Sequence, residues 1–102
     1  MEEETWTVTL VGRAKKSDKV LSDTAQDSLV LLMKEMRLTG PIRPDWPKYG
    51  KLEKRKKLIP ENAHHCHLKR GRPTYVACWQ VVDKKQKLIE VYYAGTHENA
   101  PY

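Results

Sequence analysis

Phenylalanine is absent from this sequence, cysteine occurs only twice, and no apolar run approaches the length of a membrane-spanning helix. A helix that crosses a membrane needs about 20 consecutive apolar residues, so we expect no membrane partner. The two cysteines, Cys66 and Cys78, are too few for a scaffold held by disulfides. The acidic segment 1–4 does not resemble a signal peptide. These features together predict a cytoplasmic protein.

The length of 102 residues leaves room for one domain with one modest core. Because phenylalanine is missing, three tryptophans and five tyrosines must supply most of the bulky burial. We therefore predict a single domain over residues 1–102, with a small and partly aromatic core.

Positive charge is in excess and is grouped along the chain. Nineteen lysines and arginines against thirteen aspartates and glutamates give a net charge of +6, which favours a polyanionic partner such as nucleic acid. The runs 48–57 and 69–72 hold two cationic groups that bracket residues 58–68. A solvated charge run is the alternative interpretation. The candidates for binding RNA phosphates are Lys51, Lys54, Arg55, Lys69, Arg70 and Arg72.

The first forty residues predict a strand followed by helical structure. Segment 5–11 alternates tryptophan, valine and leucine with three threonines, which is typical of a strand. The pattern becomes helical after Gly12, and Ser22 or Asp23 provides a cap for an amphipathic helix that ends at Gly40. Apolar residues recur in that helix at intervals of three and four, at Ala25, Leu29, Leu32, Met33 and Met36, and we expect the last four in the core.

The remainder predicts irregular chain and then three strands. Segment 41–63 holds four of the six prolines, and we expect Trp46 and Tyr49 to pin it to the domain. Strand patterns follow at 63–68, 74–83 and 87–95, joined by short polar loops. Alternation on the last strand predicts that Tyr92 and Tyr93 lie on opposite faces. The predicted fold class is α+β, with a helical hairpin packed on a small antiparallel sheet in the order β-α-α-β-β-β.

Strand alternation divides the histidines of segment 63–68 between the two faces of the sheet. His65 and His67 point to one side and are expected to face solvent, close to the cations of 69–72. The other side then carries His64, Cys66 and Leu68, of which the cysteine and the leucine are expected to face the core.

Two histidines beside phosphate-binding cations suit proton transfer during RNA cleavage, because the ordinary pKa of imidazole lies nearest neutrality. Cleavage needs a base for the ribose 2′-hydroxyl, cations for the charged phosphorane and an acid for the leaving 5′-oxygen. No metal or other cofactor is required. Two alternatives stay open: solvent-exposed histidines without chemistry, or zinc held by His65 and His67 with Cys78 or His97, for which no CxxC or HxxxH motif is present.

The run HHCHLKRGRPTYVACWQVVDKKQKLIEVYYAGTHENAPY and the helical region before it resemble the RelE/ParE superfamily of toxins from type II toxin–antitoxin systems. The resemblance covers nearly the whole chain. It is most specific over residues 63–102, where a basic strand, a Trp-Gln-Val strand and a strand leading into Gly-Thr-His-Glu occur in family order. It implies a RelE-like toxin domain whose fold is similar to that of microbial ribonucleases.

RelE-like members cut messenger RNA in the ribosomal A site, so the resemblance implies a ribosome-dependent endoribonuclease that blocks translation. His65 and His67 match the basic positions of the family's second strand, as proton acceptor and phosphate binder. His97 matches the basic residue after the last strand, and Tyr102 matches a tyrosine that stacks on the base or assists proton transfer. The resemblance therefore implies four catalytic residues and no metal.

One position departs from the family pattern. The third strand carries Val76 where the family has a phosphate-stabilising arginine, so that role is vacant or falls to Arg70 or Arg72. The departure keeps two other functions open: a non-catalytic domain that binds RNA or the ribosome, and a DNA gyrase inhibitor like those of the ParE branch. The clustered histidines argue against the gyrase inhibitor, which has no evident use for them.

The resemblance also implies protein partners. A cognate antitoxin neutralises such toxins and docks near their helices, so part of the helical surface is expected to be an interface. The ribosome and messenger RNA are the expected targets. Operator DNA is expected to be contacted only through the antitoxin complex.

Overall fold

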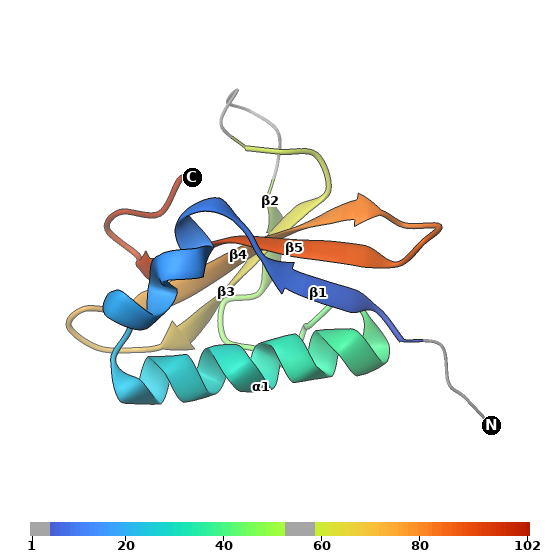
Figure 1. The fold of residues 1–102 in the computed structure, drawn as a ribbon. Helices are drawn as coiled ribbons and strands as arrows, with labels where there is room; N and C mark the ends of the chain where they lie inside the picture. Colours follow the sequence, from blue (N-terminus) through green and yellow to red (C-terminus); the bar gives the residue numbers. More distant parts are fainter. Residues whose placement is uncertain (1–4, 53–58) are drawn as a thin grey trace.

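A computed structural model describes residues 5–52 and 59–102 of the chain (Figure 1). In these ranges the elements are, in order, β1 (Thr7–Leu10), the 3-10 helix η1 (Gly12–Lys19), α1 (Asp23–Thr39), β2 (Gly50–Leu52), β3 (Ala63–Lys69), β4 (Tyr75–Asp83) and β5 (Leu88–Thr96). No helix within the described ranges is long and apolar enough to cross a membrane.

The amphipathic helix predicted from the sequence is confirmed as α1. Ser22 caps it, because its Oγ accepts a hydrogen bond from the backbone N–H of Ala25 at 3.2 Å. The helix ends at Gly40, whose φ of 94° favours glycine. Its buried stripe consists of Ala25, Leu29, Leu32 and Met36, which follows the predicted spacing. Met33, also expected in the core, is only partly buried against it.

The prediction of a helical hairpin is wrong, because the segment before α1 forms the 3-10 helix η1. The backbone N–H of Ala14 donates to the carbonyl of Val11, and that of Val20 donates to Ser17, both at a spacing of three residues. The segment GRAKKSDK contains one apolar residue, Ala14. It therefore lacks the apolar stripe that stabilises an α-helix through packing.

The described strands form one sheet in the order β1-β5-β4-β3-β2. The strands predicted near 63–68, 74–83 and 87–95 are confirmed as β3, β4 and β5, which pair antiparallel. The prediction of a wholly antiparallel sheet of four strands is wrong, since β1 pairs parallel with β5 and the short β2 adds an edge beside β3. Hairpin signals indicate only consecutive pairs, and β1 pairs with a strand distant in sequence.

A bulge in β5 changes the facing of the two adjacent tyrosines. Cys78 pairs with Tyr93, but the next residue, Trp79, pairs with Val91, so Tyr92 is an extra residue in the ladder. Both tyrosines consequently pack in one cluster, with Tyr93 buried and Tyr92 partly buried. The prediction that they lie on opposite faces is wrong, because strict alternation fails at a bulge.

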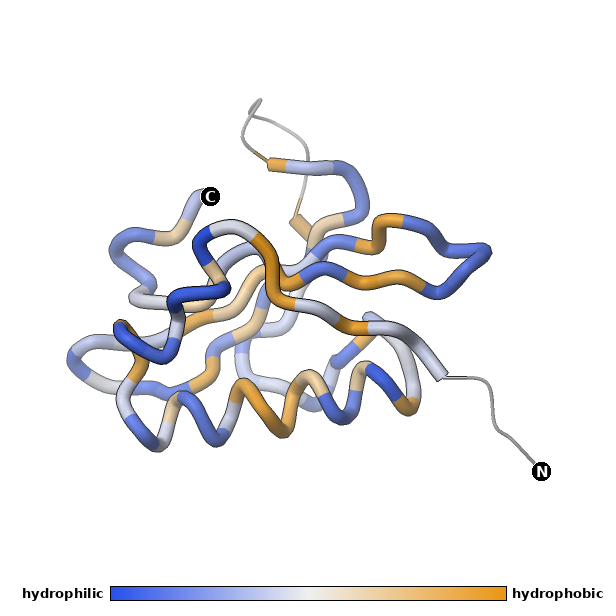
Figure 2. Tube along the Cα trace, in the orientation of Figure 1, coloured by the Kyte–Doolittle hydropathy of each residue, from blue (hydrophilic) through white to orange (hydrophobic). Residues whose placement is uncertain are grey.

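The sheet has an apolar cluster on each face. The larger cluster lies between the sheet and α1, which covers one face (Figure 1). Figure 2 shows apolar residues recurring along α1 and along the strands. The smaller cluster lies on the other face and is built from Val76, Cys78 and Tyr93, with Leu52, Tyr92, Ala100 and Tyr102 packed against it. The face without α1 is therefore covered partly by the segment that follows β5.

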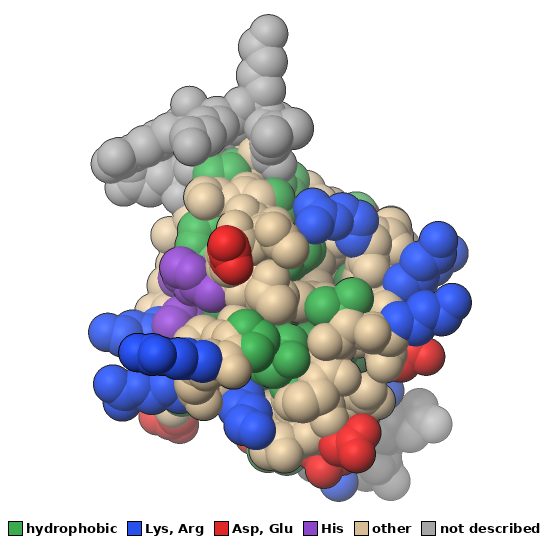
Figure 3. All heavy atoms as spheres, turned by 90° about the vertical axis from the view of Figure 1, so that its left-hand side faces the viewer, with side chains coloured by type: hydrophobic (Ala, Val, Ile, Leu, Met, Phe, Trp, Pro, Cys, Tyr) green, Lys and Arg blue, Asp and Glu red, His purple; other side chains and the backbone are tan. Residues whose placement is uncertain are grey.

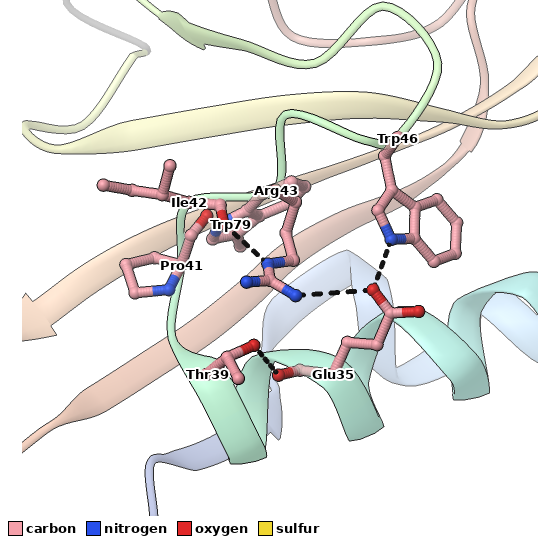
Figure 4. A network of polar contacts seen from close by, with 7 residues as sticks. All are labelled: Glu35, Thr39, Pro41, Ile42, Arg43, Trp46 and Trp79. Atoms are coloured by element: carbon pink, nitrogen blue, oxygen red, sulfur yellow. Dashed lines mark hydrogen bonds and ion pairs between the residues drawn. The ribbon is translucent and has the colours of Figure 1, made fainter.

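The chain between α1 and β2 is fixed to the helix by polar contacts (Figure 4). Trp46 Nε1 donates to the Glu35 carboxylate at 2.8 Å, and Arg43 lies 3.4 Å from the same oxygen. Trp79 Nε1 donates to the carbonyl of Pro41 at 3.0 Å. Tyr49 packs against the core between the sheet and α1, so the predicted pinning by Trp46 and Tyr49 is confirmed.

Candidate functional site

Four side chains singled out from the sequence come together on the face of the sheet opposite α1. The ring centroids of His67 and His97 are 5.5 Å apart and nearly perpendicular at 73°. Those of His97 and Tyr102 are 6.0 Å apart at 87°, and those of His65 and Tyr102 are 4.9 Å apart at 34°. These four residues form what we call the histidine cluster. Its members come from β3 and from the segment after β5, which are about thirty residues apart in sequence.

The alternation of β3 gives His65 and His67 a common face, as predicted. His65 pairs with Cys78 and His67 with Val76, and both partners belong to the cluster opposite α1. Cys66 is buried in the core beneath α1. The strand therefore places one histidine pair on the partly open face.

Backbone hydrogen bonds turn the segment after β5 back over the sheet. The N–H of His97 donates to the carbonyl of Thr74 at 2.8 Å. Asn99 and Ala100 donate to the carbonyls of Thr96 and His97 at 3.3 and 3.2 Å. This turn brings His97 beside His67, and Tyr102 beyond it over His65.

An open hollow of about 700 Å³ adjoins the cluster. His67 and His97 both line it, together with Arg72 and Glu98. Its remaining lining residues are Gly71, Pro73 and Thr74, from the loop between β3 and β4. Figure 3 shows histidine side chains at this end of the molecule with lysine and arginine side chains beside them. Two imidazoles thus share a solvent-accessible space with a cation.

The pKa values of two clustered histidines are lowered. Partial burial lowers the pKa of His67 most, and the charges of His97, Lys48 and Arg70 lower it further. Burial also lowers the pKa of His65, with smaller contributions from His67 and His97. Both imidazoles are therefore mainly neutral at pH 7, and His67 in the hollow is ready to accept a proton.

Tyr102 remains a hydroxyl donor, because burial raises its pKa to about 12. Its Oη is buried and has no hydrogen-bond partner among the described residues. Nδ1 of His65, in the ring packed against it, is likewise buried without a partner in the described chain. Buried polar atoms are usually paired, so two such atoms without a partner in one ring contact are an unusual feature of the cluster.

The cations of the loop between β3 and β4 lie beside the cluster. Arg72 lines the hollow, and Arg70 is close enough to His67 to lower its pKa. Lys69, at the end of β3, is exposed. Val76 is fully buried opposite His67, so an arginine does not stand at that point of the sheet. The loop therefore supplies one arginine that lines the hollow and another whose charge acts on His67.

The other predicted phosphate-binding residues are not brought to the cluster. Lys51 pairs with His64 and lines a separate pocket of about 360 Å³. That pocket also contains Trp6 and Pro41 and lies on the opposite face of the sheet from His65. Lys54 and Arg55 fall outside the described residues.

The cysteines are buried free thiols on different faces of the sheet. Cys66 lies in the core beneath α1 and Cys78 in the smaller cluster. Burial raises the pKa of each thiol to about 12, so neither is a thiolate at pH 7. Within the described ranges, no three side chains of His, Cys, Asp or Glu are grouped closely enough to hold a metal ion.

Two residues beside the cluster were not singled out from the sequence. Lys48 lies close enough to His67 to lower its pKa, and the carbonyl of Pro47 accepts the His67 N–H at 2.8 Å. Gly50 lies against His65, since a Cβ at that position would be 3.2 Å from Nε2. Membership of the cationic run indicated Lys48, whereas Gly50 carried only a loop signal because β2 was not predicted.

No protein-family model, curated protein or solved structure matches this chain. The geometry of the histidine cluster is therefore the basis on which a function is assigned.

Proposed function

We propose that this protein is a RelE-like toxin that cleaves messenger RNA without a metal ion. The observation that carries the proposal is the placement of His67 and His97 in one open hollow with Arg72. A proton acceptor, a second imidazole and a cation are the groups that cleavage through the ribose 2′-hydroxyl requires. They are contributed by three separate segments of the chain, which the fold gathers at one place.

His67 is assigned as the base. Its lowered pKa leaves the imidazole neutral near pH 7, so it removes the proton of the 2′-hydroxyl as that oxygen attacks the adjacent phosphorus. Its neighbour on the strand, Cys66, is buried on the other face, so the strand fixes the direction in which His67 points. The attack forms the new bond of a cyclic phosphate.

His97 is assigned as the acid. In its protonated form it gives a proton to the 5′-oxygen as the bond from phosphorus to that oxygen breaks. The products are a 2′,3′-cyclic phosphate on one fragment and a 5′-hydroxyl on the other. The proton taken by His67 returns to solvent and His97 takes up another, which balances the cycle.

Arg72 supplies the positive charge that Val76 does not. The phosphorane carries an extra negative charge, which a guanidinium stabilises through directed hydrogen bonds. Arg72 lines the hollow and Arg70 lies near His67, so the loop replaces the strand position of the family pattern. The ring of Tyr102, packed on His65, is assigned to stack on a base of the RNA.

The biological setting follows from the resemblance. The target is messenger RNA in the ribosomal A site, and a cognate antitoxin neutralises the protein. Exposed apolar side chains on α1 support a protein partner at that surface: Val30, Leu31 and Leu38. The proposed contact with operator DNA is made only by the complex with the antitoxin.

Mapping RNA ends on translating ribosomes tests the proposal. Purified protein should produce new 5′-hydroxyl ends at A-site codons, and His97→Ala should lower the cleavage rate at least about 100-fold because the acid is lost. Arg72→Ala should lower it as well, whereas Lys85→Ala, which removes an exposed cation from the distant turn after β4, should not. Equal rates for His97→Ala and wild type would overturn the assignment.

A non-catalytic ribosome-binding domain is the second candidate, and the buried Val76 favours it. Phosphate contacts do not require proton transfer, so such a domain would bind ribosomes in a salt-dependent way and leave the message intact. Intact message with DNA damage after induction would instead indicate gyrase inhibition.

A further inference from the structure

Tyr93 lies beneath the turn that carries His97. Its hydroxyl donates a hydrogen bond to the carbonyl of Thr96 at 2.7 Å, one residue before His97. On the other side of that peptide bond, the N–H of His97 donates to the carbonyl of Thr74. The peptide bond that introduces His97 is thus held at both its oxygen and its nitrogen.

The ring of Tyr93 is fixed from two sides. It lies over Gly95, where a Cβ would come within 2.8 Å of the Tyr93 Oη and 3.1 Å of Cζ. The guanidinium carbon of Arg13 lies 4.8 Å from the ring centroid, within the range of a cation–π contact. Arg13 belongs to η1, which packs on β5. Only the bulge at Tyr92 allows two adjacent tyrosines to share this face.

The hydroxyl of Tyr93 keeps its donor proton at neutral pH. Burial raises its pKa, and this effect exceeds the opposite effects of the Thr96 contact and of Arg13. Tyr93 is buried, with 4% of the residue's surface exposed, and it is not among the residues that line the hollow. It therefore has no access to the hollow, and its contact with Thr96 is the way in which it affects the site.

We propose that Tyr93 is a positioning residue for His97, locked in place by Arg13 above its ring and by the absence of a side chain at Gly95. This inference rests on the proposed function where it concerns cleavage, but the orientation of His97 is a property of the protein alone. The 3-10 helix η1 then has a role in the site although none of its residues lines the hollow.

Tyr93→Phe tests the inference with little change in packing. The phenyl ring keeps its contacts with Arg13 and Gly95 and loses only the hydrogen bond to Thr96. In NMR spectra of the free protein, the imidazole signals of His97 should shift, while those of His64 on the opposite face stay unchanged. In cleavage assays, kcat should fall about tenfold with KM unchanged, since a small misplacement of a reacting group is costly.

Tyr92→Phe is the matched control. Tyr92 is the adjacent residue on the same face. Its hydroxyl forms no hydrogen bond with a nitrogen or oxygen atom of the described residues. It should leave the His97 signals and kcat unchanged. Unchanged His97 signals in Tyr93→Phe, or equal shifts in both variants, would overturn the inference. If the wild-type protein cuts no RNA, the proposed function fails, and the His97 signals still decide whether Tyr93 positions this residue.

Discussion

The hydroxyl of Tyr49 lies 2.9 Å from Nδ1 of His64, in a stack that continues onto Trp79. The next residue along the strand, His65, faces the opposite side of the sheet and packs on Tyr102. Adjacent histidines thus have different environments. The first belongs to the packed interior, and the second belongs to the histidine cluster.

His64 should make the fold sensitive to mild acid. Burial, and then the charges of Lys51 and His65, lower its pKa from 6.5 to about 4. The unfolded chain therefore takes up a proton first as the pH falls, so stability is full above pH 6.5 and decreases between pH 6.5 and 4. We expect a loss of about 2 kcal/mol by pH 5 from this residue.

Urea unfolding at pH 7.5 and pH 5 measures this loss. His64→Phe keeps a ring in the stack and removes the titrating group. The difference in its unfolding free energy between pH 7.5 and pH 5 should therefore be about 2 kcal/mol smaller than in the wild type. An identical pH dependence in the two proteins would contradict the prediction.

Arg70→Gln should raise the pKa of His67. The charge of Arg70 is one of the causes that lower this pKa, so removing it moves the value back towards that of free histidine. As the pH falls, His67 then becomes protonated at a higher pH than in the wild type. The cleavage rate should therefore begin to decrease at a higher pH. NMR titration of the free protein measures the change without substrate.

Salt provides the control for the Arg70 prediction. Interactions between exposed charges are largely screened at about 1 M salt, where the Debye length is about 3 Å. The difference in His67 titration between wild type and Arg70→Gln should therefore shrink in high salt. A difference that persists there would point to a conformational cause instead.

Gly50→Ala should disturb His65. The new Cβ would lie 3.2 Å from Nε2, so the imidazole must shift on Tyr102. We expect a loss of about 1 kcal/mol in the free energy of unfolding from this overpacking. In a double-mutant cycle with His65→Ala, which vacates the space, the cost should largely disappear. Additive effects would show that the two residues do not interact.

Glu35→Ala should loosen the chain between α1 and β2. The change leaves Trp46 Nε1 without its acceptor and removes the ion pair with Arg43. We expect a loss of about 1–2 kcal/mol in unfolding free energy, mostly from the unpaired indole N–H. Asp27→Ala, an exposed carboxylate on the same helix, should change stability by less than about 0.5 kcal/mol.

The parts of the fold that the sequence predicted are those with strong local patterns. Ser22, Gly40 and the apolar spacing between them specified α1, and strand alternation placed His65 and His67 on one face. The short strand at Gly50 was missed because three residues carry too little pattern to distinguish from a loop. The parallel pairing of β1 with β5 was missed because it depends on packing between distant segments.

The membership of the histidine cluster was predictable, but its arrangement was not. Residue types and family order pointed to His97 and Tyr102, and the fold brings them to the strand histidines. Strand alternation alone gave no sign of the extra residue in β5 that turns Tyr92 and Tyr93 to one face. Likewise, the facing of Lys51 depends on its pairing with His64 in a strand that was not predicted.

The position of β5 between β1 and β4 has a consequence for synthesis of the chain. β1 leaves a ribosome before β5, yet among the described strands it pairs only with β5. His65 and His67 are likewise synthesised before their ring partners Tyr102 and His97, which follow β5. The pairing of β1 and the histidine cluster are therefore both completed only after β5 and residues 97–102 have been synthesised, so a nascent chain that lacks them holds neither the finished sheet nor the assembled site.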